Sequence, residues 1–185
     1  MKKPLLILVS GIPATGKTTL AKKISSHFKL PLFSADRIKE IISDRIAGRE
    51  NAELFQKVAS SSFDIFYYVL ENIVGIGSSC VAEALFIAEF SELKIKKLQN
   101  KYKCQIVQIN LNCNIKNATT RYNKRHLSGK RHRCHIPTLA MGLKKYGGYK
   151  NLVKKSKLNV GKIIKIDTND FKKINYSELY NEISS

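Results

Sequence analysis

The strongest constraint on the fold is a segment in which an apolar run leads into a glycine-rich turn and then into a helical pattern. The run is Pro4-Leu5-Leu6-Ile7-Leu8-Val9, and the turn is Gly11-Ile12-Pro13-Ala14-Thr15-Gly16-Lys17-Thr18. The turn fits Gly-x-x-x-x-Gly-Lys-[Ser/Thr], a loop whose backbone N–H groups surround phosphates. A strand, a loop and a helix in this order point the helix N-terminus at an anion. The segment therefore predicts an α/β chain that binds a nucleoside triphosphate.

Each polar group of such a loop has its own partner. Lys17 would supply a positive charge to the β- and γ-phosphate oxygens, and the Thr18 hydroxyl would reach Mg²⁺. The alternative is a plain glycine turn with Lys17 in solvent. The residues expected to contact the nucleotide are Gly11, Ile12, Pro13, Ala14, Thr15, Gly16, Lys17, Thr18 and Thr19.

Strand patterns alternate with helical patterns along the whole chain. Strands are expected at 4–9, 31–33, 79–82, 104–111 and 162–166, and helices at 17–29, 36–47, 52–74, 90–100, 115–127 and 177–184. Alternation of this kind predicts a parallel sheet with helices on both faces. The length of 185 residues fits one domain over residues 1–185, since domains usually have about 100–200 residues. Ligands of such sheets bind at the carboxyl ends of the strands.

Two acidic residues follow expected strands at that edge. Asp36 comes after the second strand, where a carboxylate could orient an acceptor hydroxyl and take its proton. The alternative is a plain helix cap, a common role of Asp. Glu83 ends the third strand and could hold Mg²⁺ together with Thr18, or it could be a solvated strand-end carboxylate.

Residues 121–133 are strongly basic and contain four of the seven arginines of the chain. Arg121 and Arg125 are four residues apart and would share a helix face, and Arg131 follows the break at Gly129. We expect a lid at about 121–137 whose arginines Arg121, Arg125 and Arg131 close over the transferred phosphoryl group, because arginine binds phosphate bidentately. The alternative is a solvated basic helix.

The lid region also contains His126, His132, Cys134 and His135 within ten residues. Histidine and cysteine are zinc ligands, but the usual paired spacing is missing, so zinc is the less favoured reading. The four cysteines are expected to be reduced. Cys80 and Cys104 are expected to be small core residues.

The charge is unevenly distributed. Residues 1–92 carry 11 Lys/Arg and 10 Asp/Glu, whereas residues 93–185 carry 22 and 4, and the net charge is +19. A basic half of this kind favours polyanions such as nucleic acid. The alternative is a lysine-rich composition with solvated helix faces, since lysine outnumbers arginine 26 to 7. No apolar run approaches the ~20 residues of a membrane span, so we expect no membrane partner and a cytoplasmic location.

Taken together, these residues resemble one branch of the P-loop kinases. The branch includes polynucleotide 5′-kinases, zeta-toxin-type kinases, gluconate and shikimate kinases and the chloramphenicol phosphotransferase. The resemblance rests on Leu8-Val-Ser-Gly-Ile-Pro-x-x-Gly-Lys-Thr-Thr-Leu-Ala21, on Phe33-Ser-Ala-Asp36 followed by Lys39, and on Arg131-His132. It implies a three-layer sandwich with sheet order 2-3-1-4-5, ATP as donor, Mg²⁺ and a hydroxyl acceptor. The chain departs from the branch at Ala14, where glycine is usual, at Lys39, where arginine is more frequent, and at Glu83, where aspartate is frequent.

The sequence thus favours an ATP-dependent kinase that phosphorylates a hydroxyl group. A small-molecule acceptor is the first expectation, and a nucleic-acid 5′-hydroxyl is a second. Two other classes stay open: a nucleotide-gated ATPase or regulatory module that acts through a macromolecular partner, and a non-catalytic basic nucleic-acid binder.

Overall fold

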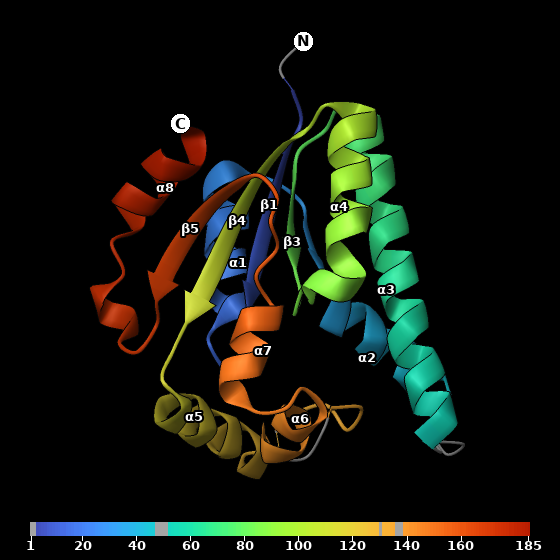
Figure 1. The fold of residues 1–185 in the computed structure, drawn as a ribbon, viewed down its shortest axis with the longest axis vertical. Coiled ribbons are helices and arrows are strands. Elements are labelled where there is room, and N and C mark those ends of the chain that lie inside the picture. The colour runs from blue at the N-terminus through green and yellow to red at the C-terminus, as the bar shows by residue number, and fades with distance from the viewer. Residues whose placement is uncertain (1–2, 47–51, 130, 136–138) are drawn as a thin grey trace.

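The computed structural model describes residues 3–46, 52–129, 131–135 and 139–185. In these ranges the strands are β1 (Leu5–Gly11), β2 (Leu32–Ser34), β3 (Cys80–Glu83), β4 (Gln105–Asn112) and β5 (Lys162–Asp167). They form one sheet in the order β2-β3-β1-β4-β5, and every pairing is parallel (Figure 1). The predicted fold class and strand order are therefore confirmed.

Helices connect the strands and cover both faces of the sheet. They are α1 (Lys17–Phe28), α2 (Ala35–Arg45), α3 (Ala52–Gly75), α4 (Ala88–Tyr102), α5 (Ile115–Leu127), α6 (Leu139–Lys145), α7 (Tyr149–Lys155) and α8 (Tyr176–Ser184), with a 3₁₀ turn η1 (Phe171–Lys173). Of these elements, α6, α7 and η1 were not predicted from the sequence. The expected end of the second helix at residue 47, and residues 130, 136 and 137 of the expected lid, lie outside the described residues.

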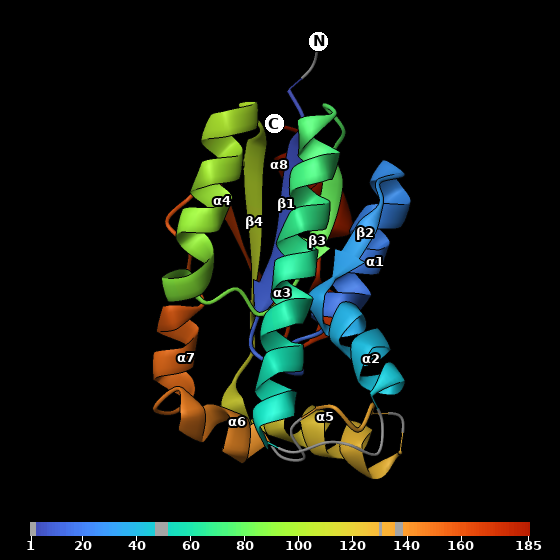
Figure 2. The same cartoon turned by 90° about the vertical axis from the view of Figure 1, so that its right-hand side faces the viewer.

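The two faces of the sheet have separate cores. On one face α1 and α8 pack against the odd-numbered residues of β1, with Ile24 and Ile183 buried there. On the other face α3 and α4 pack against the even-numbered residues, with Phe66 and Ile95 buried (Figure 2). Burial on both sides explains why β1 reads as a continuous apolar run.

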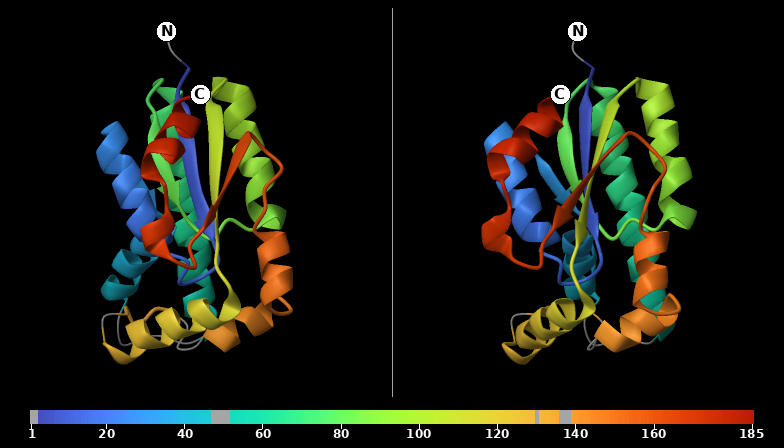
Figure 3. Two further views of the ribbon diagram at one scale, coloured as in Figure 1. Left: turned by 90° about the vertical axis from the view of Figure 1, so that its left-hand side faces the viewer. Right: turned by 60° about the vertical axis from the view of Figure 1, so that its left-hand side comes forward.

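A third apolar cluster lies beyond the carboxyl ends of the strands. It joins Ile12 of the phosphate-loop sequence to Tyr122 of α5, Leu139 of α6 and Leu152 of α7. Figure 3 shows α5, α6 and α7 gathered at this end of the sheet. The cluster fixes these helices beside the edge at which ligands of parallel sheets bind.

The cysteines and the membrane prediction can be checked against this fold. The four cysteines are free and buried, and Cys80 and Cys104 lie in the core against α3 and α4, as predicted. Among the described residues, no helix combines the length and the apolar character that crossing a bilayer requires.

Candidate active site

The glycine-rich loop connects the end of β1 to the start of α1 and adopts a tight turn. The Thr15 hydroxyl donates to the carbonyl oxygen of Ile12 at 2.8 Å. Gly16 precedes α1 with a φ of 90°, a region that glycine enters without strain. Ala14 has a φ of 67°, where a side chain costs roughly 1–2 kcal/mol. This left-handed backbone is a physical reason for glycine at the position where this chain has Ala14.

Lys17 begins α1 and is 8% exposed. Its Nζ donates to the carbonyl oxygen of Ile12 at 3.2 Å, so the ammonium group lies over the loop. Burial lowers the pKa of Lys17, and the positive charges of Arg125 and Arg131 lower it further, whereas the negative charges of Glu83 and Asp36 raise it. A buried ammonium group with a lowered pKa gains most from an anionic ligand, because the ligand restores the interactions lost with water.

Glu83 lies at the carboxyl end of β3, opposite Ser34 of β2 and Val9 of β1 in the strand register. The Thr18 hydroxyl donates to Glu83 Oε1 at 3.2 Å, and the Ser34 hydroxyl donates to Oε2 at 2.7 Å. The carboxylate is 2% exposed. A hydroxyl and a carboxylate side by side are oxygen ligands of the kind that Mg²⁺ prefers, and Mg²⁺ commonly uses one carboxylate plus phosphates and water. The residues present therefore fit Mg²⁺.

Asp36 lies in the first turn of α2 and is exposed. The capping role that was its alternative belongs to Ser34, whose Oγ accepts from the Arg37 backbone N–H at 3.4 Å. Among the described residues, Asp36 makes no hydrogen bond or ion pair, yet its charge raises the pKa of both Lys17 and Arg131. The carboxylate is therefore close to both cations and available to a ligand.

Arg131 is a half-buried cation with incomplete hydrogen bonding. Its guanidinium lies 4.0 Å from the centre of the Tyr122 ring. Its Nε and Nη1 atoms are buried and have no hydrogen-bond partner among the described residues. Burial lowers the pKa of Arg131, and the nearby positive charge of Arg125 lowers it further. Buried polar atoms without partners are uncommon in native proteins and mark a place for a ligand or water.

Arg121 was expected over the phosphoryl group together with Arg125 and Arg131, and here it contacts the segment that follows β5. Its Nη1 and Nη2 donate to the carbonyl oxygens of Thr168 at 2.7 Å and Asn169 at 2.8 Å. Its guanidinium also lies 4.2 Å from the centre of the Phe171 ring. These contacts connect α5 to the segment after β5. Arg121 shares a helix with Arg125, and here its Nη donors bind backbone oxygens. Its expected role over the phosphoryl group stays a prediction.

The lid residues 131–135 contact α2 through two histidines. His132 Nε2 lies 2.9 Å from Asp44 Oδ1, and His135 Nε2 lies 2.9 Å from Glu40 Oε1. No group of three or more His, Cys, Asp or Glu side chains with the arrangement of a metal site occurs among the described residues. The histidines therefore bind carboxylates of α2 in this structure, which does not support the less favoured zinc reading.

Because of the burial of His135 beside Glu40, the stability of the protein should decrease as the pH is lowered from neutral. Burial lowers the pKa of His135, although its hydrogen bond to Glu40 opposes this. In the unfolded chain His135 takes up a proton as the pH drops below about 6.5, whereas in the folded chain it does so only at lower pH. The free energy of unfolding therefore decreases as the pH is lowered through this range. We expect the urea midpoint to fall between about pH 7.5 and about pH 5.5, and to fall less in His135→Gln, which keeps a donor for Glu40. An equal fall in both proteins would contradict the assignment.

Between about pH 7.5 and about pH 5.5 Glu40 does not contribute to this change, because its pKa is lowered and lies below that range. Burial raises the pKa of Glu40, but hydrogen bonds from His135 and Arg37 outweigh it, so the pKa is lowered overall. The contribution of Glu40 to the free energy of unfolding is therefore fully present above about pH 4.3, the pKa of Glu in an unfolded chain. It is lost only as the pH falls through the lower pKa of Glu40 in the folded protein.

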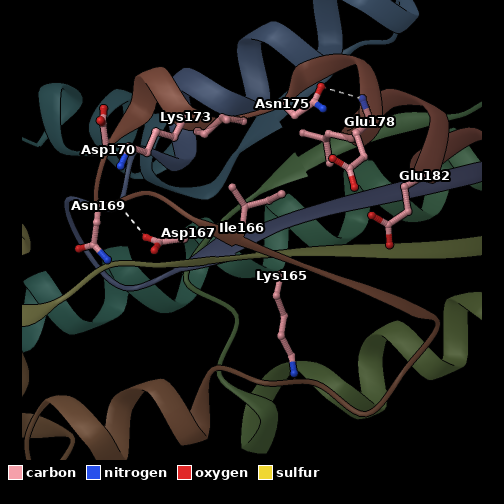
Figure 4. Close-up of a pocket in the computed structure, with 11 residues that line it drawn as sticks. Lys165, Ile166, Asp167, Asn169, Asp170, Lys173, Asn175, Glu178 and Glu182 are labelled. Atoms are coloured by element: carbon pink, nitrogen blue, oxygen red, sulfur yellow. Dashed lines mark hydrogen bonds between the residues drawn. The ribbon is translucent and has the colours of Figure 1, made fainter.

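A cavity of about 380 Å³ lies beside the carboxyl end of β5, outside the site described so far (Figure 4). Asp167, Asn169 and Asp170 line it from the β5 side, and Glu178 and Glu182 line it from α8. Figure 4 shows Lys165 pointing away from these acids, toward the opposite face of the sheet.

Three residues of the site were not identified from the sequence. Ser34 shares the Glu83 carboxylate with Thr18, and Tyr122 supports Arg131. The third is Phe171, whose ring would lie 2.5 Å from a Cβ at Gly16. Ser34 had a usable signal, since it ends a strand two residues before Asp36. Tyr122 and Phe171 had none, because their positions depend on how α5 and η1 pack.

Comparison with known proteins agrees with this geometry. Residues 7–108 match the family described as ATPase family associated with various cellular activities (AAA). The chain belongs to the AAA family. The matched residues include the glycine-rich loop, Asp36 and Glu83, so the loop is that of a P-loop nucleoside triphosphatase. No curated protein matches the chain.

Solved structures share the fold over nearly the whole chain. A "putative kinase" from Chloroflexus aurantiacus superposes with a TM-score of 0.84 at 24% identity, covering 99% of this chain and 98% of its own. A gluconokinase from Sinorhizobium meliloti gives 0.55 at 12% identity, covering 99% and 91%. Kti12 from Chaetomium thermophilum, solved with ADP-AlF3, gives 0.57 at 12% identity, covering 98% and 100%. At these identities the likeness shows a shared fold, which is that of kinase-like P-loop proteins.

Proposed function

We propose that this protein is an ATP-dependent phosphotransferase that moves the γ-phosphoryl group of ATP to a hydroxyl acceptor. The observation that carries the proposal is the placement of Asp36. This carboxylate is unpaired among the described residues and lies near enough to Lys17 and Arg131 to raise the pKa of both. A kinase needs a carboxylate near its phosphate lysine to orient the acceptor hydroxyl and take its proton. In an ATPase the same group would orient a water molecule, so transfer of label to an acceptor distinguishes the two.

The chain's own groups suit the steps of this reaction. The acceptor oxygen forms a bond to the γ-phosphorus, and the bond from that phosphorus to the β–γ bridging oxygen breaks, which releases ADP. Asp36 accepts the hydroxyl proton. Lys17 and Arg131 offer positive charge to the phosphoryl oxygens, where charge spreads in the transition state. Bound Mg²⁺, held by Thr18 with Glu83 beside it, would neutralise phosphate charge.

Arg125 and the α2 contacts complete the proposed site. Arg125 is exposed, and its charge lowers the pKa of both Lys17 and Arg131, so it lies near the same space. The contacts of His132 and His135 with α2 bring the adjoining Arg131 to the side of Asp36. We propose that residues 121–137 act as the lid of a single domain, with Arg125 and Arg131 as its phosphate-binding arginines.

A radiochemical screen tests the proposal directly. The purified protein is incubated with Mg²⁺ and γ-labelled ATP together with pools of candidate acceptors, which are sugars and sugar acids, aminoglycoside-type alcohols, nucleosides and 5′-hydroxyl oligonucleotides. We expect label to move to one pool, and ATP consumption to rise when that pool is present. A protein that hydrolyses ATP at the same rate with every pool, and labels none, would contradict the proposal. A nucleotide-gated ATPase would then be the better description.

A further inference from the structure

The helices α6 and α7, with the two residues that follow α7, carry a set of lysines that pair with no acid among the described residues. The set is Lys144, Lys145, Lys150, Lys154, Lys155 and Lys157, and all six are exposed. Among the described residues none of these six forms an ion pair. The nearest acids in the sequence are Glu92 and Asp167, since residues 93–166 contain neither Asp nor Glu. We call these six residues the α6–α7 lysines.

Four lysines of α3 and α4 are arranged differently. On α3 and α4, Lys57 pairs with Glu53 at 2.7 Å and Lys96 pairs with Glu92 at 2.6 Å. Lys94 and Lys101 of α4 pair with acids of α3, at 3.2 Å and 2.9 Å. Among the described residues, exposed lysines without an ion pair also occur on α1, α4 and α5, at Lys22, Lys97 and Lys124. What distinguishes α6 and α7 is that residues 144–157 hold six exposed lysines and no acid, which concentrates positive charge on one part of the molecule.

That part lies at the carboxyl edge of the sheet, beside the phosphate loop. Figures 1 and 3 show α6 and α7 together beyond the ends of β1 and β4, next to α5. A notch of about 100 Å³ lies between α7 and the strand ends, lined by Gly11, Asn110, Lys157 and Lys165 among others. Asn110 is 9% exposed, and its Oδ1 is buried without a hydrogen-bond partner. The notch is therefore lined by two lysines and by the polar residue Asn110.

We infer that the α6–α7 lysines and this notch bind the backbone of a single-stranded nucleic acid. Lysines arranged without acids bind phosphates by releasing condensed counterions. A strand of nucleic acid carries many phosphates and can contact several of the α6–α7 lysines at once, which a single free phosphate cannot. This inference does not depend on the phosphotransferase proposal, because the strand can bind here whether or not it is the acceptor.

The composition of α7 favours nucleic acid over an anionic membrane. Its inward residues Tyr149, Leu152 and Val153 pack into the cluster that contains Ile12 and Tyr122. Its exposed residues are Lys150, Asn151, Lys154 and Lys155. A helix that lies on a bilayer needs an apolar face for the lipid, and the apolar face of α7 is already buried.

The test compares two triple variants that lose the same charge. Lys150→Ala/Lys154→Ala/Lys157→Ala removes three of the α6–α7 lysines. Lys57→Ala/Lys96→Ala/Lys101→Ala removes three lysines that pair with acids on α3 and α4. Binding of a labelled single-stranded RNA of about 12 nucleotides, within the ~4–16 that single-strand binding folds cover, is measured by fluorescence anisotropy at several salt concentrations. Urea midpoints check that both variants fold.

The expected result follows from counterion release. For single strands the logarithm of affinity falls by about 0.7 per phosphate contact for each tenfold rise in salt. Loss of three contacts should therefore lower the salt slope by about 2 and weaken binding about 100-fold near 0.1 M salt. The control triple variant should keep the wild-type slope. Lys17→Ala should keep RNA binding, because Lys17 does not line the notch.

Three results would overturn the inference. One is an unchanged slope in the α6–α7 variant. Another is an equal loss in both triple variants, which would mean that only net charge matters. The third is tighter binding to phosphatidylserine vesicles than to the RNA, with vesicle binding lost in the α6–α7 variant, which would assign the surface to a membrane.

Discussion

Replacing Asp36 with Asn should abolish phosphoryl transfer to the acceptor while nucleotide binding stays intact. Asn keeps the size and polarity of the side chain but cannot take a proton. General-base catalysis by a positioned carboxylate contributes about 10²–10⁴-fold. We therefore expect kcat to fall by about that factor, measured with γ-labelled ATP and the acceptor that the screen identifies. The structure adds a reason to expect a stable variant, since the cap of α2 is Ser34 and not Asp36.

Asp64→Asn is the matched control for this experiment. Asp64 lies on α3, is largely exposed and pairs with Lys94, so its replacement removes the same charge away from the site. It should leave kcat unchanged. Nucleotide affinity, measured by calorimetry with Mg²⁺ and a non-hydrolysable ATP analogue, should be similar in wild type and in both variants. Full transfer activity in Asp36→Asn would mean that the carboxylate has no part in the reaction.

Replacing Lys17 with Ala should remove turnover of ATP in any form, with or without an acceptor. The Lys17 ammonium group is the buried charge of the loop, and its present hydrogen-bond partner is a carbonyl oxygen of the same loop. Removing one preorganised donor to a transition-state anion costs about 10²–10³ in kcat, or about 2.7–4 kcal/mol. Initial rates of ADP release would measure the loss.

Lys22→Ala provides the comparison for Lys17→Ala. Lys22 lies on the same helix but is exposed, so its loss removes one positive charge without touching the loop. Its turnover should match wild type. The lowered pKa of Lys17 also predicts that Lys17→Ala is not strongly destabilised, because burial of that charge is unfavourable without a ligand. Normal turnover in Lys17→Ala would show that the loop does not act on the γ-phosphate.

The sheet could be predicted because its strands are buried on both faces. A strand such as β1 then appears as an uninterrupted apolar run, and the helices between strands show the spacing of an amphipathic face. The loop could be predicted because its backbone requires glycine at Gly16 and its chemistry requires Lys17. Strand order came from the resemblance to P-loop kinases, since the alternation of elements gives the fold class and leaves the order open.

The α5–α7 region was harder to predict for physical reasons. The helices α6 and α7 have seven residues each, which is too short for a clear period, and Gly147 and Gly148 between them read as a loop. The spacing of Arg121 and Arg125 correctly placed them on one helix. It could not reveal that the carbonyl oxygens after β5 lie within reach of Arg121, because that contact joins residues 47 and 48 positions apart.

The contacts of Arg121 have a mechanical consequence. The guanidinium fastens α5 to Thr168 and Asn169, and it lies on the ring of Phe171, which itself fills the space beside Gly16. A tilt of α5 must either break these bonds or pull the ring away from the start of α1. A movement of α5 is therefore coupled to the residues around Gly16, so this helix and the glycine-rich loop cannot rearrange independently.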